Sequence, residues 1–532
     1  YSVMSERRDP RLRLATQGRG LDRREAIRLL AAAGSAAAAA PWLSGCKGSE
    51  SPPRLVLLYA TCSLNASYLA PYGGEPGLTP WIQQFAAGSA ILERHQSECG
   101  QSGIAYASIF SGTQADRHGI YDHPRIIGTD VELITEAFAA AGYEVFFWGA
   151  HGMASYRLGY GQGVPPEHHR MAVLEAGDPL FETILDRLDA DPDYRAFVLT
   201  NFTVTHMKYT ANENFFDEQL RGPEVLPGDL AALGLDPETL RRHTSLLLDG
   251  ASVFAISGRT EETIRDWGLD RQEARQFHAS MEYLYRCAVH RLDGLFGGIW
   301  RRLQERGLSD GSLVVFTADH GETLFREGTL FKYAHGFQLA PEVLRVPMII
   351  HGPSVGIGAH RHGFVSRSID VLPTMAGVCG VPLSSSNPPD GVDLSASLRG
   401  HAHPPELTAF SHTSLVHEVI GAIPEYRDSL LYRLYPARAP ELMGVCARRG
   451  DTVVKWTRGA GAEGEFRATA YDLDRDPREL QNRYDPADPG HAQLLIELKA
   501  YKERLVAAYE PPADDLDEAE RIRQLKALGY LE

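Results

Sequence analysis

The stretch Leu313–Glu322, with the sequence LVVFTADHGE, decides the predicted fold. It begins with a run of apolar or β-branched residues, which is typical of a strand buried on both faces of a parallel sheet. The run ends at Asp319-His320, and ligands of open α/β sheets bind beyond the carboxyl ends of the strands. A carboxylate beside an imidazole is a common ligand pair for a divalent cation. The alternative is a helix N-terminus, with Asp319 as its cap and His320 on the surface.

Other strands and helices alternate along the chain around this stretch. Apolar runs predict strands at 54–59, 90–92, 143–148, 195–204 and 346–351. Helical periodicity and caps predict helices at 104–110, 131–141, 178–188 and 277–306. Such alternation indicates an α/β fold, with a large, mostly parallel central sheet sandwiched by helices.

The chain divides into three parts by pattern. Residues 54–403 carry the alternating elements, interrupted at about 209–276 by an acidic insertion with some helix. Residues 404–532 predict a small C-terminal α+β domain, built from a hairpin at 442–456, a strand at 469–473 and a helix at 494–509. Residues 1–53 are not part of the fold and consist of a signal and a polar tether.

The first part resembles a twin-arginine export signal that ends in a bacterial lipobox. Arg23-Arg24 precede a small-residue apolar run, which ends at Leu43-Ser44-Gly45-Cys46. We therefore expect an extracytoplasmic lipoprotein anchored at Cys46, on the periplasmic face or the cell surface, with no other contact with the membrane. The alternative is an alanine-rich helix with a chance cysteine.

Composition restricts the classes of function. A net charge of −16 argues against a nucleic-acid partner. Beyond Cys46, five cysteines remain and none stands in a CxxC motif. Because five is odd, at least one thiol would stay free in an oxidising compartment. These are Cys62, Cys99, Cys287, Cys379 and Cys446.

Several motifs, in order from Leu55 to the C-terminus, together resemble the sulfatase family of the alkaline phosphatase superfamily. They are LVLLYATCSLNASYLAPYG, LTPWIQQFAAG, SGIAYASIFSG, VVFTADHGE, HGFQLAPEVLRVPMIIHGP, IDVLPTMAGVCGVP, YDLDRDPREL and LKALGYL. The resemblance implies an alkaline phosphatase-like α/β sandwich and a divalent metal. It also implies hydrolysis of sulfate or phosphate esters, with small molecules or glycans as substrates.

The same resemblance implies roles for individual residues. Asp319 and His320 match the family's later metal ligands. His206 and His335 match histidines that approach the ester, where they would hold its oxygens or protonate the leaving group. His335 and Lys332 would also contact the substrate. Glu322 either orients His320 or is a solvated carboxylate. His118 is expected to be structural, and His351, His360 and His362 are expected at the surface.

Ser102 occupies the nucleophile position. Many sulfatases oxidise a cysteine or serine there to formylglycine, which requires Pro or Ala two residues later and Arg four residues later. Ile104 and Tyr106 stand at those positions, so formylglycine is not expected. Ser102 is predicted to act as a direct nucleophile at a helix N-terminus. The alternative is a simple helix cap.

The end of the first strand departs from the family pattern. Cys62-Ser63 replace the acidic metal ligands, and Asn65 and Ser67 replace a nearby Arg and Asp. Calcium prefers several oxygen ligands, whereas a thiolate with Asp319 and His320 suits zinc, so the identity of the metal stays open. Cys62 is alternatively a small buried residue in a decayed site, or the partner of Cys99 in a disulfide. A catalytically impaired protein that acts as a binding or structural module is therefore the second functional hypothesis.

Overall fold

The computed structural model of the chain describes residues 51–122, 124–207, 209, 229–248, 253–326, 332–333, 335–413, 442–458 and 465–510. They belong to one of two compact units, Ser51–Glu532. The other unit, Tyr1–Glu50, contains the predicted export signal with Cys46 and lies outside the described residues, as do part of the insertion and the terminal LKALGYL. None of the described helices is both long and apolar enough to cross a membrane.

An eight-stranded sheet forms the centre of this unit. All neighbouring strands pair in parallel except β7, which is antiparallel to both of its neighbours. The predicted mostly parallel sheet is therefore confirmed. In spatial order the strands are β4 (His169–Arg170), β3 (Glu144–Gly149), β5 (Ala196–Phe202), β1 (Leu55–Thr61), β6 (Ser312–Ala318), β7 (Met348–His351), β2 (Ala90–Gln96) and β8 (His360–Arg367).

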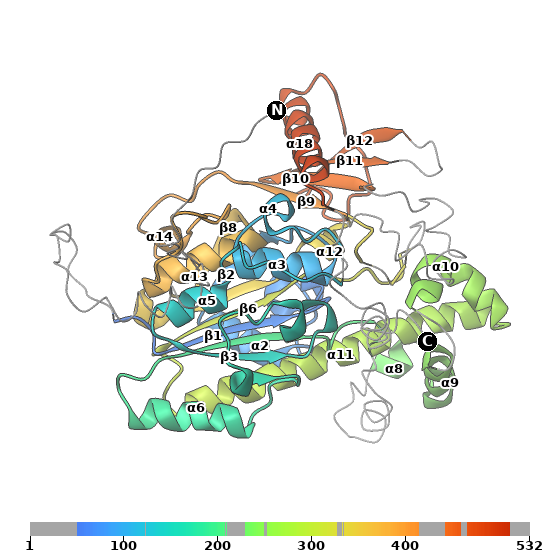
Figure 1. Cartoon of the computed structure of the whole chain (residues 1–532). Helices are drawn as coiled ribbons and strands as arrows, with labels where there is room; N and C mark the ends of the chain where they lie inside the picture. The colour runs from blue at the N-terminus through green and yellow to red at the C-terminus, as the bar shows by residue number, and fades with distance from the viewer. Residues whose placement is uncertain are drawn as a thin grey trace, which may run out of the picture. The chain divides into compact units, whose positions relative to one another are not determined.

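Helices cover both faces of the sheet (Figure 1). One layer contains α3 (Ser102–Ser111), α5 (Ile134–Ala140) and α13 (Val371–Cys379); the other contains α2 (Pro80–Ala87), α6 (Pro179–Ala190) and α11 (Arg271–Glu305). Alternate residues of β1 enter opposite cores: Leu57 packs in one and Leu58 in the other. Because both faces are buried, β1 and β6 are mainly apolar.

The other described α-helices connect or extend these layers. They are α4 (Ala115–His118), α8 (Asp229–Ala232), α9 (Pro237–Leu248), α10 (Val253–Asp266), α12 (Pro341–Leu344) and α14 (Ser395–Leu398). Three of them, α8 to α10, lie in the predicted insertion, which is helical in its described part.

A second, antiparallel sheet follows in the C-terminal part. Its order is β12 (Phe466–Asp472), β11 (Thr452–Arg458), β10 (Gly444–Arg449) and β9 (Thr408–His412), and α18 (Pro489–Ala507) packs against it. The predicted hairpin, third strand and helix are all present. Sequence analysis missed β9 here, and β4 and β8 in the central sheet. These strands are short or polar: β8 reads HRHGFVSR and lies at the sheet edge, where no apolar run is needed.

The loop between β2 and α3 buries a carboxyl group. Glu98 is 1% exposed, and its Oε2 accepts a long hydrogen bond of 3.5 Å from Gln114 Nε2. Burial raises the pKa of Glu98 to about 8, an effect that the positive charge of Arg367 only partly offsets. At neutral pH this glutamate is therefore a protonated, neutral group in the folded protein.

Glu98 should make folding stability fall as pH rises. In the unfolded chain the carboxyl ionises near pH 4.5, whereas in the folded protein it keeps its proton to about pH 8. The contribution of this carboxyl to the free energy of unfolding is complete below the pKa of the unfolded chain. It is lost as the pH rises toward 8, by up to about 1.4 kcal/mol per pH unit. The free energy of unfolding, measured in urea from pH 5 to 8, should fall less steeply with pH for Glu98→Gln than for wild type. The exposed Glu503→Gln should behave like wild type, and equal slopes for wild type and Glu98→Gln would contradict the argument.

Candidate active site

Two pairs of polar residues leave neighbouring strands at the same edge of the central sheet. Because β1 and β6 pair in parallel and in register, Cys62-Ser63 and Asp319-His320 follow the strand ends side by side. The backbone N–H of Asp319 donates to Thr61 O at 3.0 Å, and that of Ser63 donates to Asp319 Oδ1 at 3.1 Å. Ser63 has a φ of +56°, so the chain turns directly after the strand and both pairs stay at the edge.

Ser102 lies against these residues as the first residue of α3. Its side chain is buried, and its Oγ lies 3.1 Å from His320 Nε2 and 3.3 Å from Cys62 Sγ. The His320 Nδ1–H donates to Gly321 O at 2.8 Å, so Nε2 presents a lone pair to the Ser102 hydroxyl. The residue before Ser102, Gln101, occupies the cap position and its side chain makes no capping bond. The first N–H groups of α3 are thus available to an anion beside Ser102.

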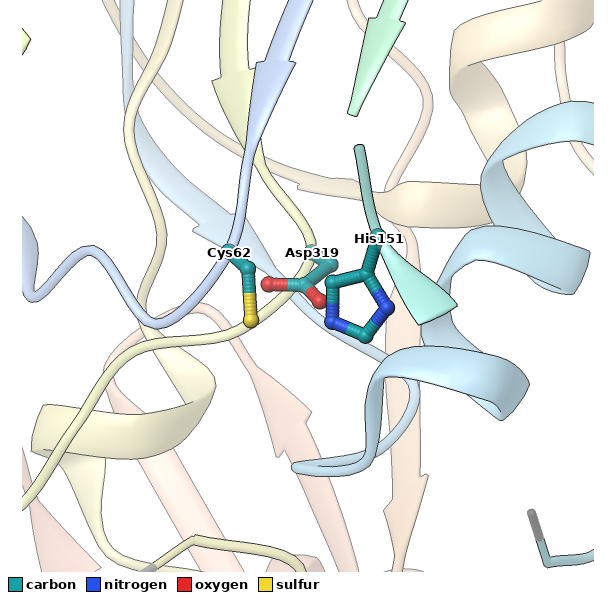
Figure 2. Close-up of side chains that lie close together, drawn as sticks. All are labelled: Cys62, His151 and Asp319. Carbon is teal, nitrogen blue, oxygen red and sulfur yellow. The ribbon is translucent and has the colours of Figure 1, made fainter. Parts of the chain in front are cut away.

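Three buried side chains form a group that fits a metal ion. Ligand atoms of Cys62, His151 and Asp319 all lie within 4.8 Å of one another, and Figure 2 shows the three side chains pointing toward one another. Asp319 Oδ2 makes no hydrogen bond to any described residue and lies 3.5 Å from His320 Nε2. Cys62 Sγ lies 4.0 Å from the same nitrogen. Sulfur, nitrogen and a single carboxylate suit zinc better than calcium.

Burial disfavours the charged form of both acidic members of this group. Burial, and then the charge of Asp319, raises the pKa of the Cys62 thiol well above its usual range. Burial also raises the pKa of Asp319. A cation would reverse both effects, since metal ligands bind in the deprotonated form. The buried acids and the orphaned Oδ2 therefore fit a divalent cation. The metal roles of Cys62, Asp319 and His320 remain predictions.

Sequence analysis missed His151. It follows β3 closely, so the rule that ligands bind beyond strand ends makes it a candidate, but only the order of the strands brings it to Cys62 and Asp319. The Met153 N–H donates to His151 Nδ1 at 3.1 Å, which places the proton of the neutral ring on Nε2. Of the two imidazoles near Cys62, His320 therefore has the tautomer ready to bind a cation through Nε2.

His335 stacks on His320, and His206 meets His335 edge to face. The ring centroid of His335 lies 4.5 Å from that of His320 and 5.0 Å from that of His206. Burial lowers the pKa of His206 to about 3, with His335 adding to the effect, and burial also lowers the pKa of His335 well below its usual range. Both rings are therefore neutral at physiological pH. Neutral rings suit the predicted role of holding ester oxygens. Protonating the leaving group would require a charged ring.

Glu322 contacts His335 and not His320. Its Oε2 lies 3.2 Å from His335 Nδ1, while His320 Nδ1 is bound to Gly321 O. Glu322 is fully buried, and burial raises its pKa to about 8. Both expectations for Glu322 were thus wrong, because the turn after Asp319 carries its side chain inward toward the loop that contains His335.

Lys332 contacts the insertion. Its Nζ lies 2.8 Å from Glu261 Oε1 on α10, and it lies over the ring of Phe325, 5.6 Å from the centroid. Because Glu261 is distant in sequence and lies in the weakly patterned insertion, this partner was not foreseeable. The substrate-binding role of Lys332 remains a prediction.

Three other expectations are settled by burial and bonding. All described cysteines are free thiols, so the alternative of a Cys62–Cys99 disulfide is wrong. His118 is structural as expected, with Nε2 at 3.1 Å from Ser108 Oγ. His351 and His362 are buried, contrary to the expected surface position: His351 ends an interior strand, and the ring of His362 packs against His360 and Phe364. His360 is exposed, as expected.

Comparisons with known proteins agree with this geometry. Residues 55–381 match the family model described as Sulfatase. Over 218 residues the chain is 28% identical to choline-sulfatase of Rhizobium meliloti, a match that covers 41% of this chain and 38% of that relative. The chain thus spans about two-fifths of the length of that relative.

Solved structures share the fold. A protein solved in complex with its substrate D-glucosamine-2-N,6-O-disulfate superposes with a TM-score of 0.58 at 18% identity, covering 87% of this chain and all of that one. The phosphonate monoester hydrolase of Agrobacterium radiobacter gives 0.57 at 17% identity, covering 86% of this chain and 96% of that one. At these identities the likeness concerns the fold.

Proposed function

Because this chain belongs to the sulfatase family, we propose that it hydrolyses sulfate esters or the related phosphate and phosphonate esters. One observation carries the proposal: Ser102 Oγ, at the start of α3, lies 3.1 Å from a histidine lone pair and beside a buried carboxylate. A hydroxyl at a helix N-terminus can attack an anionic centre whose oxygens the helix N–H groups bind. The substrates are small molecules or glycans that carry such an ester.

The residues divide the reaction between them. Ser102 Oγ forms a bond to the sulfur or phosphorus atom as the bond to the ester oxygen breaks, and the proton of the Ser102 hydroxyl passes to the leaving alcohol. Water then releases the anion from Ser102 and restores the hydroxyl. The neutral rings of His206 and His335 hold ester oxygens, and Glu322 keeps His335 in place. Unmodified serine does this work, because the pattern for formylglycine is absent.

Cys62 and Asp319, with His320 or His151, would hold a divalent cation beside Ser102. Such a cation supplies positive charge that stabilises the ester oxygens and lowers the pKa of a bound hydroxyl. The rest of the site excludes water, since all of these side chains are buried.

A panel of esters tests the proposal. The purified protein, with its metal content measured, should be assayed against sulfate, phosphate and phosphonate monoesters of one phenol. Turnover of at least one ester, lost in Ser102→Ala, would support it. The second candidate, a binding module that has lost catalysis, is favoured by Cys62 at the position of a family carboxylate. It would be supported by the absence of turnover together with an empty metal site.

We further propose that the protein is exported and anchored by lipid on Cys46. The paired arginines and the sequence Leu43-Ser44-Gly45-Cys46 support this proposal. Cys46→Ala should move the protein from the membrane fraction to the soluble fraction, measured by fractionation and by mass spectrometry of the N-terminus. A matched Ser44→Ala change, which leaves a small residue before the cysteine, should keep it in the membrane fraction. A Cys46→Ala protein that remains membrane-bound would contradict the proposal.

A further inference from the structure

A cavity of about 360 Å³ lies between the central sheet and the C-terminal sheet. Three arginines line it: Arg94 from β2, Arg345 directly after α12, and Arg448 from β10. Ser102 and the metal group do not line this cavity. It is thus a separate place in the fold, which combines basic residues from distant parts of the chain.

Arg448 is buried without a counter-ion. It is 4% exposed, and its Nε donates to Gly450 O at 3.0 Å. Within the described part of the chain no carboxylate pairs with it, and its terminal N–H groups have no acceptor. Burial, together with the positive charges of Arg94 and Arg345, lowers the pKa of Arg448 to about 10, and the negative charge of Asp451 opposes this shift. A buried cation that faces two others is unfavourable unless an anion joins them.

Arg345 is partly buried and likewise has no counter-ion among the described residues. Its Nε donates to the carbonyl oxygen of Glu93 at 3.3 Å, and its guanidinium lies 5.6 Å from the ring centroid of Tyr72. No ion pair joins it to a carboxylate of the described residues. Burial lowers its pKa, and Arg361 adds to the effect. Two guanidinium groups therefore face one cavity with unused donors.

Three of the four carboxylates that line the cavity form ion pairs with other residues. Glu93 pairs with Arg361 at 2.7 Å, and Asp451 pairs with Arg94 at 2.7 Å. Glu479 pairs with Lys455. Asp474 is exposed at the rim. None of the four neutralises Arg345 or Arg448, although Glu93 and Asp451 act on them from a distance.

We propose that this cavity binds a tetrahedral oxyanion, sulfate or phosphate, between Arg345 and Arg448. Guanidinium groups donate pairs of parallel hydrogen bonds that match the oxygens of such anions. The anion is either free or the terminal group of a sugar ester, for which the cavity has room. The site is independent of the ester hydrolysis proposed for Ser102, so either can fail without the other.

Crystals soaked in selenate, which has the shape of sulfate and an anomalous signal, locate the anion directly. Wild-type protein should show a peak within hydrogen-bond distance of Arg345 and Arg448, and Arg448→Met should lose it. A peak at Ser102 alone, or an equal peak in Arg448→Met, would overturn the proposal.

Calorimetry measures the same site in solution, in Ser102→Ala protein so that esters are not consumed. The dissociation constants of inorganic sulfate, inorganic phosphate and glucosamine 6-sulfate at this site should rise at least tenfold in both Arg448→Met and Arg345→Met. Arg345 is less deeply buried, so this variant keeps the test open if Arg448→Met does not fold. The exposed Arg467→Met on β12 is the matched control and should bind as before. Tighter binding of the sugar ester than of the free anions would assign the ester as ligand, and the reverse would assign the free anion. Unchanged affinities in both variants would refute the site.

Discussion

Replacing Ser102 by alanine should lower the turnover of any ester substrate by roughly 10³-fold or more, because it removes the atom that attacks the ester. The hydroxyl lies 3.1 Å from His320 Nε2 and 3.3 Å from Cys62 Sγ, and no other described hydroxyl contacts both. Kinetics with the best ester of the panel would measure the loss. Binding of substrate should persist, since the helix N-terminus and the histidines remain.

Two controls accompany this change. Cys99→Ala should keep full activity, because the Cys99 thiol is buried and burial raises its pKa to about 12, which leaves it unreactive. Mass spectrometry of the wild-type peptide should find plain serine at 102. Formylglycine at 102 or 99, or a Ser102→Ala protein that retains its activity, would contradict the assignment of the nucleophile.

Replacing Cys62 by aspartate should reverse the metal preference of the site. The soft sulfur atom favours zinc, whereas a second carboxylate next to Asp319 offers oxygen atoms of the kind that calcium and magnesium prefer. The affinity for zinc should fall on the order of 100-fold or more, and calcium binding should become measurable. Calorimetry with each metal, together with elemental analysis after dialysis, would measure both changes.

Cys99→Ser is the matched control for metal binding. Cys99 is as deeply buried as Cys62 and lies close to it in the fold, but it is not part of the metal group. The Cys99→Ser protein should therefore bind zinc with the wild-type affinity. Tight, stoichiometric calcium in the wild-type protein that survives Cys62→Ser would show that Cys62 is not a ligand and that the site keeps the family's usual preference.

Local patterns in the sequence determine the centre of the fold. β1 and β6 are buried on both faces, so each contains a run of apolar residues and ends close to polar ones. Since parallel strands place their carboxyl ends at one edge, Cys62, Asp319 and His320 were expected together before any contact was known. Ser102 was identified by its place in the motif SGIAYASIFSG, which resembles the nucleophile segment of the sulfatase family.

Elements whose position depends on distant partners were beyond the sequence. β8 is a polar edge strand that forms because β2 offers it hydrogen bonds, and its own residues carry no strand pattern. His151 joins the metal group because the sheet places the end of β3 two strands away from the end of β1. The hydrophobic periodicity of the sequence does not reveal this order of strands.

Partner choice inside the sites was likewise decided by the tertiary structure. Glu322 turns toward His335, and Lys332 meets Glu261 across the insertion. Arg345 and Arg448 meet at one cavity although about a hundred residues separate them. The physical reason is that hydrophobic periodicity acts within an element and therefore appears in the sequence, whereas charge pairing and ligand geometry depend on which elements the fold brings side by side.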